Sequence, residues 1–528
     1  MKTLKIYVLA LALLSVEGCK NFLDVEPITS VTETNYYKTP QDAYKALVGC
    51  YDGLQSVWGE GMSFPVASEI MSDNCFGGGG ASDSYNYQMI DEFDKLRSPS
   101  DQNNFGPNWT AYYKAIYRCN VLISKMDQIE WGSDATLRST YESEARFLRA
   151  YLYFDLVRLF GNIPLLTTPS AENLSQSAPD EVYKVIATDL RFAAENLPAT
   201  AYSSQPIATH GRVTKFAAEA LLGRVFLYYT GYYAKPDLVG VVGKAEALAY
   251  LENVISAGGY SLVSNFANLW PSSLAAYEGE DNKETVFAIK YTYTSDYDGN
   301  TDGNHWMVMF GMREQFVFPY GNGWGFGTVN PKLYNAYTAN DTRRAPSIIA
   351  IAAENVGFTN QSKQREYSGF YVEKYSPLVD EAGNSVAVSR GAVNFMIGQF
   401  QDYVSIRYSD VLLMAAELGS ANGQDYFDDV RRRAYQDAFT PLAVTQDNIM
   451  KERRLEFAFE GIRYWDLLRR GVSVAAQEIA ENTTLLSAGL SAPKIITASK
   501  IVETGGLQQI PYTQITLSDG VLKQNPGW

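Results

Sequence analysis

Three segments of this 528-residue chain share a helical pattern with two apolar faces, which limits the folds that it can adopt. They are EARFLRAYLYFDLVRLFG from Glu144, KFAAEALLGRVFLYYTG from Lys215 and YSDVLLMAAELGSANG from Tyr408. A helix that is apolar on two sides needs neighbours on both, and closely packed helices need a small residue where they cross. The sequence therefore predicts tetratricopeptide-like helix pairs. The small residues that align in the three segments are Ala150, Gly223 and Ala415.

The helical segments are interrupted rather than tandem. The longest interruption, at about 259–407, is rich in Gly, Asn, Tyr and Trp and includes short β-like runs such as 285–291. Long irregular segments inside a compact domain usually carry function. We therefore expect one mostly α domain over residues 40–528, with helix pairs supporting a loop-rich, partly β insertion. Smaller features of the same domain are helices expected at 40–57 and 108–129 and a Gly-rich loop at 72–107.

The first 18 residues resemble the signal peptide of a bacterial lipoprotein. Two lysines precede an apolar run over residues 6–16, which is too short to cross a bilayer as a helix. The run leads into the sequence VEGC, similar to a lipobox, with Glu17 in place of the usual small residue. We therefore predict that Cys19 is acylated and anchors the protein to a membrane, with residues 19–39 as a tether.

The charge balance argues against one class of partner. The chain carries 44 Lys and Arg against 59 Asp and Glu, a net charge of −15. A nucleic-acid binder needs a basic face that releases phosphate counterions, so no nucleic-acid partner is expected. The same balance argues against attachment to anionic lipid through charge alone.

Cysteine usage predicts no stabilising cross-link. Once Cys19 is acylated, Cys50, Cys75 and Cys119 remain, and an odd number leaves at least one thiol unpaired within the chain. Cys50 and Cys119 fall within helical patterns, where we expect small buried residues rather than a disulfide.

Catalytic motifs are hard to find, and the chain is predicted not to be an enzyme. It has two histidines, His210 and His305, which excludes His-rich metal centres and mechanisms that need several histidines. No zincin, nucleophile-elbow, phosphate-loop or dinucleotide-binding pattern occurs in its required context. We expect His210 to be structural, whereas His305 either touches a ligand or faces solvent. Paired carboxylates of the glycosidase type meet only in the fold and stay open at this stage.

One run resembles the start of a calcium loop. DGNTDG from Asp298 matches the first six positions of an EF-hand loop, but Met309 stands where that loop needs a bidentate Glu. A complete EF-hand is therefore excluded. No cofactor is expected, apart from a possible irregular calcium site on Asp298, Asn300 and Asp302.

Aromatic residues in loops give the strongest functional signal. The chain has 37 Tyr, 25 Phe and 8 Trp. A sugar ring stacks its apolar C–H face on an aromatic plate while its hydroxyls bond to Asn and Asp, and both residue kinds cluster in these loops. We assign Phe318 and Phe326 to the core. The loop aromatics that we predict to contact ligand are Tyr85, Tyr87, Tyr297, Trp306, Tyr320 and Trp324, with Asn322 as a partner for hydroxyls.

Several segments resemble the SusD/RagB family of nutrient-binding lipoproteins, and the resemblance covers nearly the whole chain. CKNFLDVEP resembles the mature start of the family. Its signature segments are matched in order by EARFLRAYLYFDLVRLFGNIPL, IRYSDVLLMAAE, ERRLEFAFEGIRYWDLLRRG and IPYTQITLSDGVLKQNPGW. The resemblance implies four tetratricopeptide-like helix pairs, a place on the cell surface, and a SusC-like TonB-dependent transporter of the outer membrane as partner. It also implies a ligand that is mostly a glycan, or a peptide in some members, and no catalysis.

The resemblance also implies roles for single residues. GNGWGFG from Gly321 is similar to the segment in which family members place a binding-site tryptophan, here Trp324. SEIMSDN from Ser68 is similar to a segment that brings polar groups to the pocket, which makes Asp73 and Asn74 candidates. Trp465 and Asp466 are assigned to packing and capping rather than to ligand.

The predicted role is thus glycan capture by stacking on Trp324 and Trp306, with delivery of the glycan to the transporter. Three alternatives stay open. In the first, the protein has the same role but its ligand is a peptide. In the second, the protein is a secreted glycoside hydrolase or lyase. In the third, it is a structural or adhesive surface protein. The absence of long tandem repeats and low-complexity stalks argues against the third.

Overall fold

The computed structural model describes residues 36–59, 62–94, 103–170, 172, 174–271 and 277–528. The predicted signal peptide and the predicted anchor Cys19 lie outside the described residues, as does most of the predicted tether.

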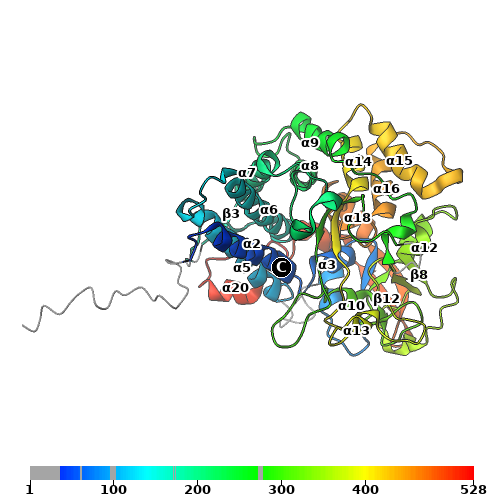
Figure 1. The fold of residues 1–528 in the computed structure, drawn as a ribbon. Helices are drawn as coiled ribbons and strands as arrows, with labels where there is room; N and C mark the ends of the chain where they lie inside the picture. The colour runs from blue at the N-terminus through cyan, green and yellow to red at the C-terminus, as the bar shows by residue number, and fades with distance from the viewer. Residues whose placement is uncertain (1–35, 60–61, 95–102, 171, 173, 272–276) are drawn as a thin grey trace, which may run out of the picture.

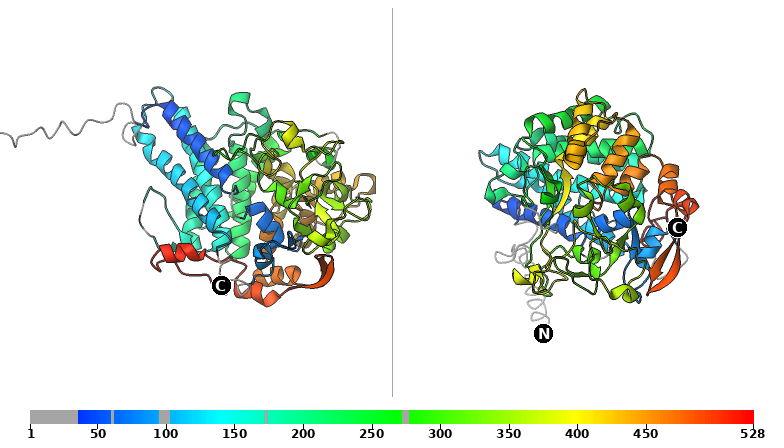
Figure 2. Two further views of the ribbon diagram at one scale, coloured as in Figure 1. Left: turned by 90° about the horizontal axis from the view of Figure 1, so that it is seen from below. Right: turned by 90° about the vertical axis from the view of Figure 1, so that its right-hand side faces the viewer.

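Long helices that pack on one another in chain order form one half of the molecule (Figure 1). Figure 2 shows several of them running side by side, with the irregular part of the chain against one side. The helices predicted at 40–57 and 108–129 and in the three patterned segments are confirmed. The long helices of this half are α2 (Pro40–Ser56), α5 (Gly106–Lys125), α6 (Ala135–Phe160), α7 (Pro179–Asn196), α8 (Lys215–Tyr232), α9 (Lys244–Ala257), α14 (Tyr408–Glu417), α15 (Gly423–Tyr435) and α16 (Gln446–Glu456).

Helix α8 shows why the two-faced pattern produces layers. It packs between α7 and α9 and also contacts α14, so apolar residues are buried around most of its circumference. Gly223 allows α9 to come close, because a Cβ atom at this position would lie 2.6 Å from Cδ2 of Leu251. The aligned Ala150 of α6 and Ala415 of α14 are fully buried as well. A small residue therefore lies at the tight contact of α8 with α9, as the sequence predicts.

The starts of these helices are fixed by side-chain caps. Thr39 and Asp42 form a capping box at the start of α2, where Pro40 occupies the first turn. The side chains of Thr214 and Thr445 accept hydrogen bonds from the backbone at the starts of α8 and α16. Each cap satisfies a backbone N–H that the helix itself leaves unpaired.

Between α9 and α14 the chain forms short elements joined by loops. They are β4 (Thr285–Ile289), α10 (Met307–Phe310), β5 (Met312–Arg313), β6 (Asn322–Gly323), β7 (Phe326–Val329), α11 (Pro331–Ala336), α12 (Arg344–Ser347), β8 (Ile348–Ala350), β9 (Phe370–Val372), α13 (Val386–Ser389) and β10 (Tyr403–Arg407). The sheets that they form are two-stranded, and β5 and β6 pair in parallel. A mostly α fold with a loop-rich, partly β half is confirmed.

Segments from both ends of the chain complete this second half. Strand β1 (Cys75–Gly78) pairs antiparallel with β7, and α3 (Phe64–Ile70) packs against α17 (Arg463–Leu468). The other elements of these segments are α4 (Asn86–Asp91), α18 (Val472–Ile479), the hairpin of β11 (Glu481–Ser487) and β12 (Leu490–Ile496), α19 (Ala498–Glu503) and α20 (Tyr512–Leu517). Residues far apart in the sequence therefore position one another.

A buried network of ion pairs joins the two halves. Glu456 of α16 pairs with Arg343 at 3.1 Å, with Arg407 at 2.8 Å and with Arg433. Burial alone would raise the pKa of Glu456, but the three guanidinium groups hold it well below its ordinary value. Glu452 and Glu460 also pair with arginines of other segments: Glu452 with Arg343 and Arg431, and Glu460 with Arg407. Removing one member of such a buried network leaves uncompensated charge.

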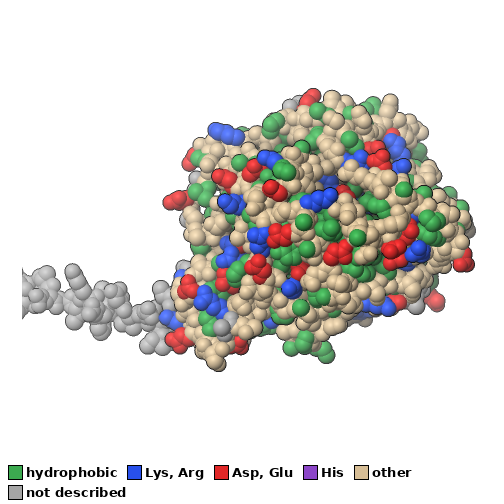
Figure 3. All heavy atoms as spheres, turned by 90° about the horizontal axis from the view of Figure 1, so that it is seen from above, with side chains coloured by type: hydrophobic (Ala, Val, Ile, Leu, Met, Phe, Trp, Pro, Cys, Tyr) green, Lys and Arg blue, Asp and Glu red, His purple; other side chains and the backbone are tan. Residues whose placement is uncertain are grey.

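Cys50, Cys75 and Cys119 are buried and free, so the prediction of small buried residues rather than a disulfide is confirmed for Cys50 and Cys119. No helix within the described residues is long and apolar enough to cross a membrane. Figure 3 shows acidic and basic side chains interspersed over one face of the molecule, so the net negative charge does not gather into one patch there.

Candidate functional site

Trp324 lies in the turn between β6 and β7 and is fixed through its backbone. Its N–H donates a hydrogen bond to the carbonyl of Val308 in α10 at 2.8 Å, and the next N–H, of Gly325, donates to Gly311 at 2.9 Å. The indole is partly exposed and meets His305 edge to face, with ring centroids 5.6 Å apart. His305 is held in turn by its Nδ1, 2.9 Å from the carbonyl oxygen of Gly59. Trp324 thus presents a partly exposed aromatic ring, and these hydrogen bonds fix the backbone that carries it.

Tyr85 is a second exposed aromatic, with half of its surface (50%) open to solvent. The guanidinium of Arg365 lies over its ring, 3.9 Å from the centroid. The same guanidinium donates hydrogen bonds to the carbonyls of Ala81, Asp83 and Ser84. One buried arginine therefore shapes the loop before α4 and supports the Tyr85 ring from beneath, a cation–π contact worth about 0.5–1 kcal/mol at exposed sites.

Arg313 connects these two aromatics. Its Nη1 lies 3.1 Å from Oδ2 of Asp83, in the Tyr85 loop, and 3.2 Å from the carbonyl oxygen of Trp324. Gly80 makes the close approach possible, because a Cβ there would lie 2.2 Å from Nη2 of Arg313. Trp324, Tyr85 and the side chains that fix them form one assembly, the Trp324 platform: Asp83, Tyr85, His305, Arg313, Trp324 and Arg365.

Asp73 and Asn74, predicted to contact ligand, are buried structural residues. Asp73 bonds both of its carboxylate oxygens to Arg463, at 2.8 and 3.0 Å, and also pairs with Arg454. Burial would raise the pKa of Asp73, but the two guanidinium groups lower it. Asn74 donates to Glu69 and accepts from Arg454. This part of the site prediction is corrected: these polar groups fasten α3 and β1 to the chain around α17.

Trp306 is also buried, with 1% of its surface exposed. Its indole packs against Phe310, Tyr375 and Tyr403, with ring centroids 5.1 to 6.2 Å apart. The structure therefore leaves Trp306 no face to offer a ligand. The correction has a simple cause: Trp306 stands directly before α10, which turns its side chain into the core.

Tyr87 and Tyr320 are buried as well, and neither presents a face to solvent. Tyr87 stacks on Phe326 with ring centroids 4.0 Å apart, in agreement with the core assignment of Phe326. Tyr320 donates a hydrogen bond to Glu354 at 3.2 Å. Phe318, assigned to the core, instead lies exposed.

Tyr297 and Asn322 keep some exposure and stay predictions. Tyr297 is 68% exposed and accepts a hydrogen bond from the amide of Asn394. Asn322 belongs to β6, two residues before Trp324, and its side-chain oxygen has no hydrogen-bond partner among the described residues.

The segment from Asp296 to Asp302 is organised by its own turns. Asp296 accepts hydrogen bonds from the N–H groups of Asp298 and Asn300, and Asn300 accepts one from the N–H of Asp302. Within the described part of the chain, no three His, Cys, Asp or Glu side chains are grouped so as to hold a metal ion. The calcium prediction thus receives no support from this geometry.

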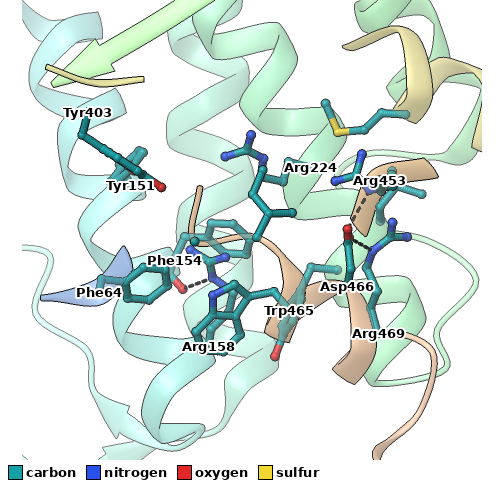
Figure 4. A pocket seen from close by; sticks show the side chains of 15 residues that line it. Phe64, Tyr151, Phe154, Arg158, Arg224, Tyr403, Arg453, Trp465, Asp466 and Arg469 are labelled. Atoms are coloured by element: carbon teal, nitrogen blue, oxygen red, sulfur yellow. Dashed lines mark hydrogen bonds and ion pairs between the residues drawn. The ribbon is translucent and has the colours of Figure 1, made fainter. Parts of the chain in front are cut away.

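A small chamber where the long helices meet α3 and α17 is too narrow for a ligand. Its volume is about 30 Å³, room for about two water molecules. Figure 4 shows Arg158 among Phe64, Phe154 and Trp465, and shows Asp466 bonded to Arg453 and Arg469. These contacts place Trp465 and Asp466 in packing and ion pairing.

The Trp324 platform suits binding better than reaction. Its arginines are engaged in holding the loops, so its exposed aromatic surfaces are what a ligand would meet. Arg313, Asp83 and Arg365 were not predicted from the sequence. Asp83 had a weak signal, since it lies in the Gly-rich loop two residues before Tyr85. No signal in the sequence pointed to Arg313 and Arg365, because their partners lie in distant segments.

Comparisons with known proteins give this architecture a family. One family model, described as starch-binding and associating with the outer membrane, matches residues 21–227. A second, described as the SusD family, matches residues 359–528, so the two together cover most of the chain. The chain belongs to the SusD/RagB family.

SusD-like relatives resemble the chain along most of its length. "SusD-like protein P2" of Formosa agariphila is 27% identical over 505 residues, covering 89% of this chain and 91% of the relative. A solved "Laminarin binding SusD-like protein" superposes with a TM-score of 0.73 at 26% identity, over 93% of this chain and all of the other. "Surface glycan-binding protein A" from Bacteroides fluxus gives 0.77 at 25% identity, with the same coverage. The fold is therefore SusD-like.

Proposed function

We propose that this SusD-like protein captures a glycan on the Trp324 platform. The observation that carries the proposal is the pair of solvent-accessible aromatics, the exposed Tyr85 and the partly exposed Trp324. Arg313 links their loops through contacts of 3.1 Å with Asp83 and 3.2 Å with the carbonyl oxygen of Trp324. Sugar rings stack on such plates while their hydroxyls bond to neighbouring polar groups. The names of the solved relatives, which refer to laminarin and to surface glycans, agree with this ligand class.

We further propose that the protein captures without cleaving. Two carboxylates that contact Arg313 of the platform have structural tasks: Asp83 pairs with Arg313, and Glu314 pairs with Arg313 and Lys363. Exposed stacking gives modest affinity, because ordering a flexible glycan offsets much of the gain from contacts. Modest affinity suits a protein that passes its ligand to a transporter.

The partner that we propose is a SusC-like TonB-dependent transporter in the outer membrane, to which the captured glycan is delivered. Family membership supports this part, together with the lipobox-like sequence before Cys19. Acyl chains on Cys19 would hold the protein at the cell surface next to the transporter. Replacing Cys19 by Ala in the full-length chain should abolish labelling with palmitate and release the protein from the outer-membrane fraction. Retention of the label would contradict the proposed anchor.

The experiment for the binding function uses the chain that starts at residue 20. Its binding to laminarin, starch, further polysaccharides and a set of peptides is measured by calorimetry and by affinity gel electrophoresis, and each mixture is analysed for products. Binding of a polysaccharide without products is the expected result. Binding of peptides alone would show that the ligand is a peptide rather than a glycan. Cleavage of any panel member would overturn the non-catalytic role.

A further inference from the structure

A groove of about 400 Å³ opens between α2, the loop 208–212 and β4. None of the residues that form the Trp324 platform lines it. Its floor is apolar and comes from both halves of the molecule, with Leu47 and Leu54 of α2 facing Phe287 and Ile289 of β4. A concave apolar floor with a few polar groups around it is the usual form of a small-ligand site.

The mouth of the groove carries an aromatic side chain. Tyr44 of α2 is 36% exposed and lies near Tyr141, with ring centroids 6.3 Å apart. Its hydroxyl has no hydrogen-bond partner within the described residues. The groove therefore offers an aromatic surface and a free hydroxyl at its entrance.

The charged groups of the groove are satisfied within the protein, with one exception. Arg212 pairs with Glu144, Asp52 pairs with Arg118, and Lys290 pairs with Asp281 at 2.8 Å. Among the described residues, the carboxylate of Asp302 has neither a hydrogen bond nor an ion pair. Its two oxygens are thus available to accept hydrogen bonds from a ligand.

These features select the chemistry of the ligand. A cationic ligand drawn to Asp302 would meet Arg212 and Lys290, which line the same groove. An anionic ligand would meet the free carboxylate. A neutral molecule rich in hydroxyl donors suits both the carboxylate and the aromatic entrance, and a saccharide is such a molecule.

The groove and the Trp324 platform are neighbours. The end of α2 and the turn that follows it contact both, since Gln55 donates to the carbonyl of Asp302 at 3.3 Å and the carbonyl oxygen of Gly59 lies 2.9 Å from Nδ1 of His305. Two residues, Gly303 and Asn304, lie between Asp302 and His305, so the Cα atoms of Asp302 and His305 are at most about 11 Å apart. A glycan of several sugar units can span such a distance.

We propose that this groove is a second saccharide-binding site, which holds a further stretch of the glycan that stacks on Trp324. Asp302 accepts hydroxyl hydrogen bonds there, and Tyr44 contacts a sugar ring at the entrance. The ligand class rests on the proposed function, whereas the location rests on the groove itself.

The test compares four proteins that start at residue 20: the wild type, Asp302→Ala, Tyr44→Ala and Lys45→Ala. Lys45 is the matched control, because it is exposed beside Tyr44 but does not line the groove. The probe is the panel polysaccharide that the wild type binds, with laminarin tried first. Since the Asp302 side chain has no partner to lose, its removal should leave thermal unfolding unchanged and keep the test valid even if Tyr44→Ala folds poorly.

We expect affinity for the polysaccharide to fall about fivefold in Asp302→Ala and Tyr44→Ala, and to stay at the wild-type value in Lys45→Ala. Wild-type affinity in Asp302→Ala would overturn the second site while leaving the proposed function intact. A wild type that binds no polysaccharide would overturn both. Loss of affinity for a cationic peptide, with polysaccharide binding unchanged, would also contradict a saccharide site.

Discussion

Trp306 and Trp324 stand eighteen residues apart in the same loop-rich half, yet the fold gives them opposite surroundings. Trp306 is enclosed by Phe310, Tyr375 and Tyr403. Among the described residues, Trp324 has one aromatic ring partner, His305, and part of its indole is exposed to solvent. The position of a tryptophan in a Gly- and Asn-rich segment therefore does not by itself predict that its ring contacts a ligand. What decides its role is whether the adjoining short element directs it inward, as α10 does, or leaves it in a turn.

Two buried carboxyls, one from each half, differ in a related way. Asp410 of α14 is enclosed, but the guanidinium groups of Arg453 and Arg224 outweigh burial and lower its pKa to about 2. The pKa of Glu373, directly after β9, shifts in the opposite direction. Burial, and next the charge of Glu354, raises its pKa to about 9. Arginine partners therefore favour the charged form of Asp410 in the helical half, whereas Glu373 in the loop-rich half favours its protonated form.

The largest expected effect is on stability, at Trp306. Trp306→Ala should lower the free energy of unfolding by about 3–5 kcal/mol, since it leaves a cavity among three aromatic rings. Denaturant unfolding measures this loss, and Trp306→Phe, which keeps a ring, should lose less. A fully stable Trp306→Ala protein that no longer binds polysaccharide would return Trp306 to the binding surface.

The matching change at Trp324 should act on binding. Trp324→Ala should weaken polysaccharide binding by about tenfold or more, because a central aromatic contact is lost. Its thermal midpoint should change far less than that of Trp306→Ala, because the indole is only partly buried. Calorimetry and thermal unfolding of the two variants side by side check the contrast. Collapse of the fold in Trp324→Ala would assign this residue to the core.

The charge comparison predicts how stability depends on pH. Glu373 has a pKa of about 9 in the folded protein, above its ordinary value of 4.5, so the folded state keeps a proton that the unfolded chain releases. Its stabilising contribution is present below pH 4.5 and is lost as pH rises through 9. In Glu373→Gln, stability measured by urea unfolding should fall less between pH 5 and 8, by about 1–3 kcal/mol. An equal dependence of the free energy of unfolding on pH in the variant and the wild type would contradict a protonated Glu373.

The smallest effect is expected at Tyr85, at the edge of the platform. Tyr85→Ala should lower polysaccharide affinity by about threefold, and stability by about 0.5–1 kcal/mol through loss of the contact with Arg365. Tyr85→Phe keeps the ring and serves as the control in the same calorimetric titration. An effect on affinity as large as that of Trp324→Ala would mean that the two rings contribute equally.

Periodicity predicts the helical half of this fold well, because its information is local. Apolar residues at helical spacing and small residues such as Gly223 describe each helix and its tight contacts without reference to the rest of the chain. The partners of Glu456 were not predictable in this way. Arg343, Arg407 and Arg433 lie far from it in the sequence, and only the fold brings them together.

The sequence predicted the exposure of the site residues only in part. Tyr85 is exposed and Trp324 is partly exposed, so their contacts with ligand stay predictions, whereas Asp73 and Asn74 are enclosed by the arginines of later segments. Whether a residue in a loop-rich segment is buried depends on which other segments pack against it, and the residue type alone does not predict this packing. Arg313 and Arg365, which hold the platform together, act through contacts with residues more than ten positions away.

The most direct test of glycan capture is a crystal structure of the chain from residue 20 with an oligosaccharide of the polysaccharide that it binds. The account predicts a sugar ring stacked on the indole of Trp324, next to Tyr85, with the glycosidic bonds intact. A sugar bound away from Trp324, with this indole still in contact with solvent, would contradict the account.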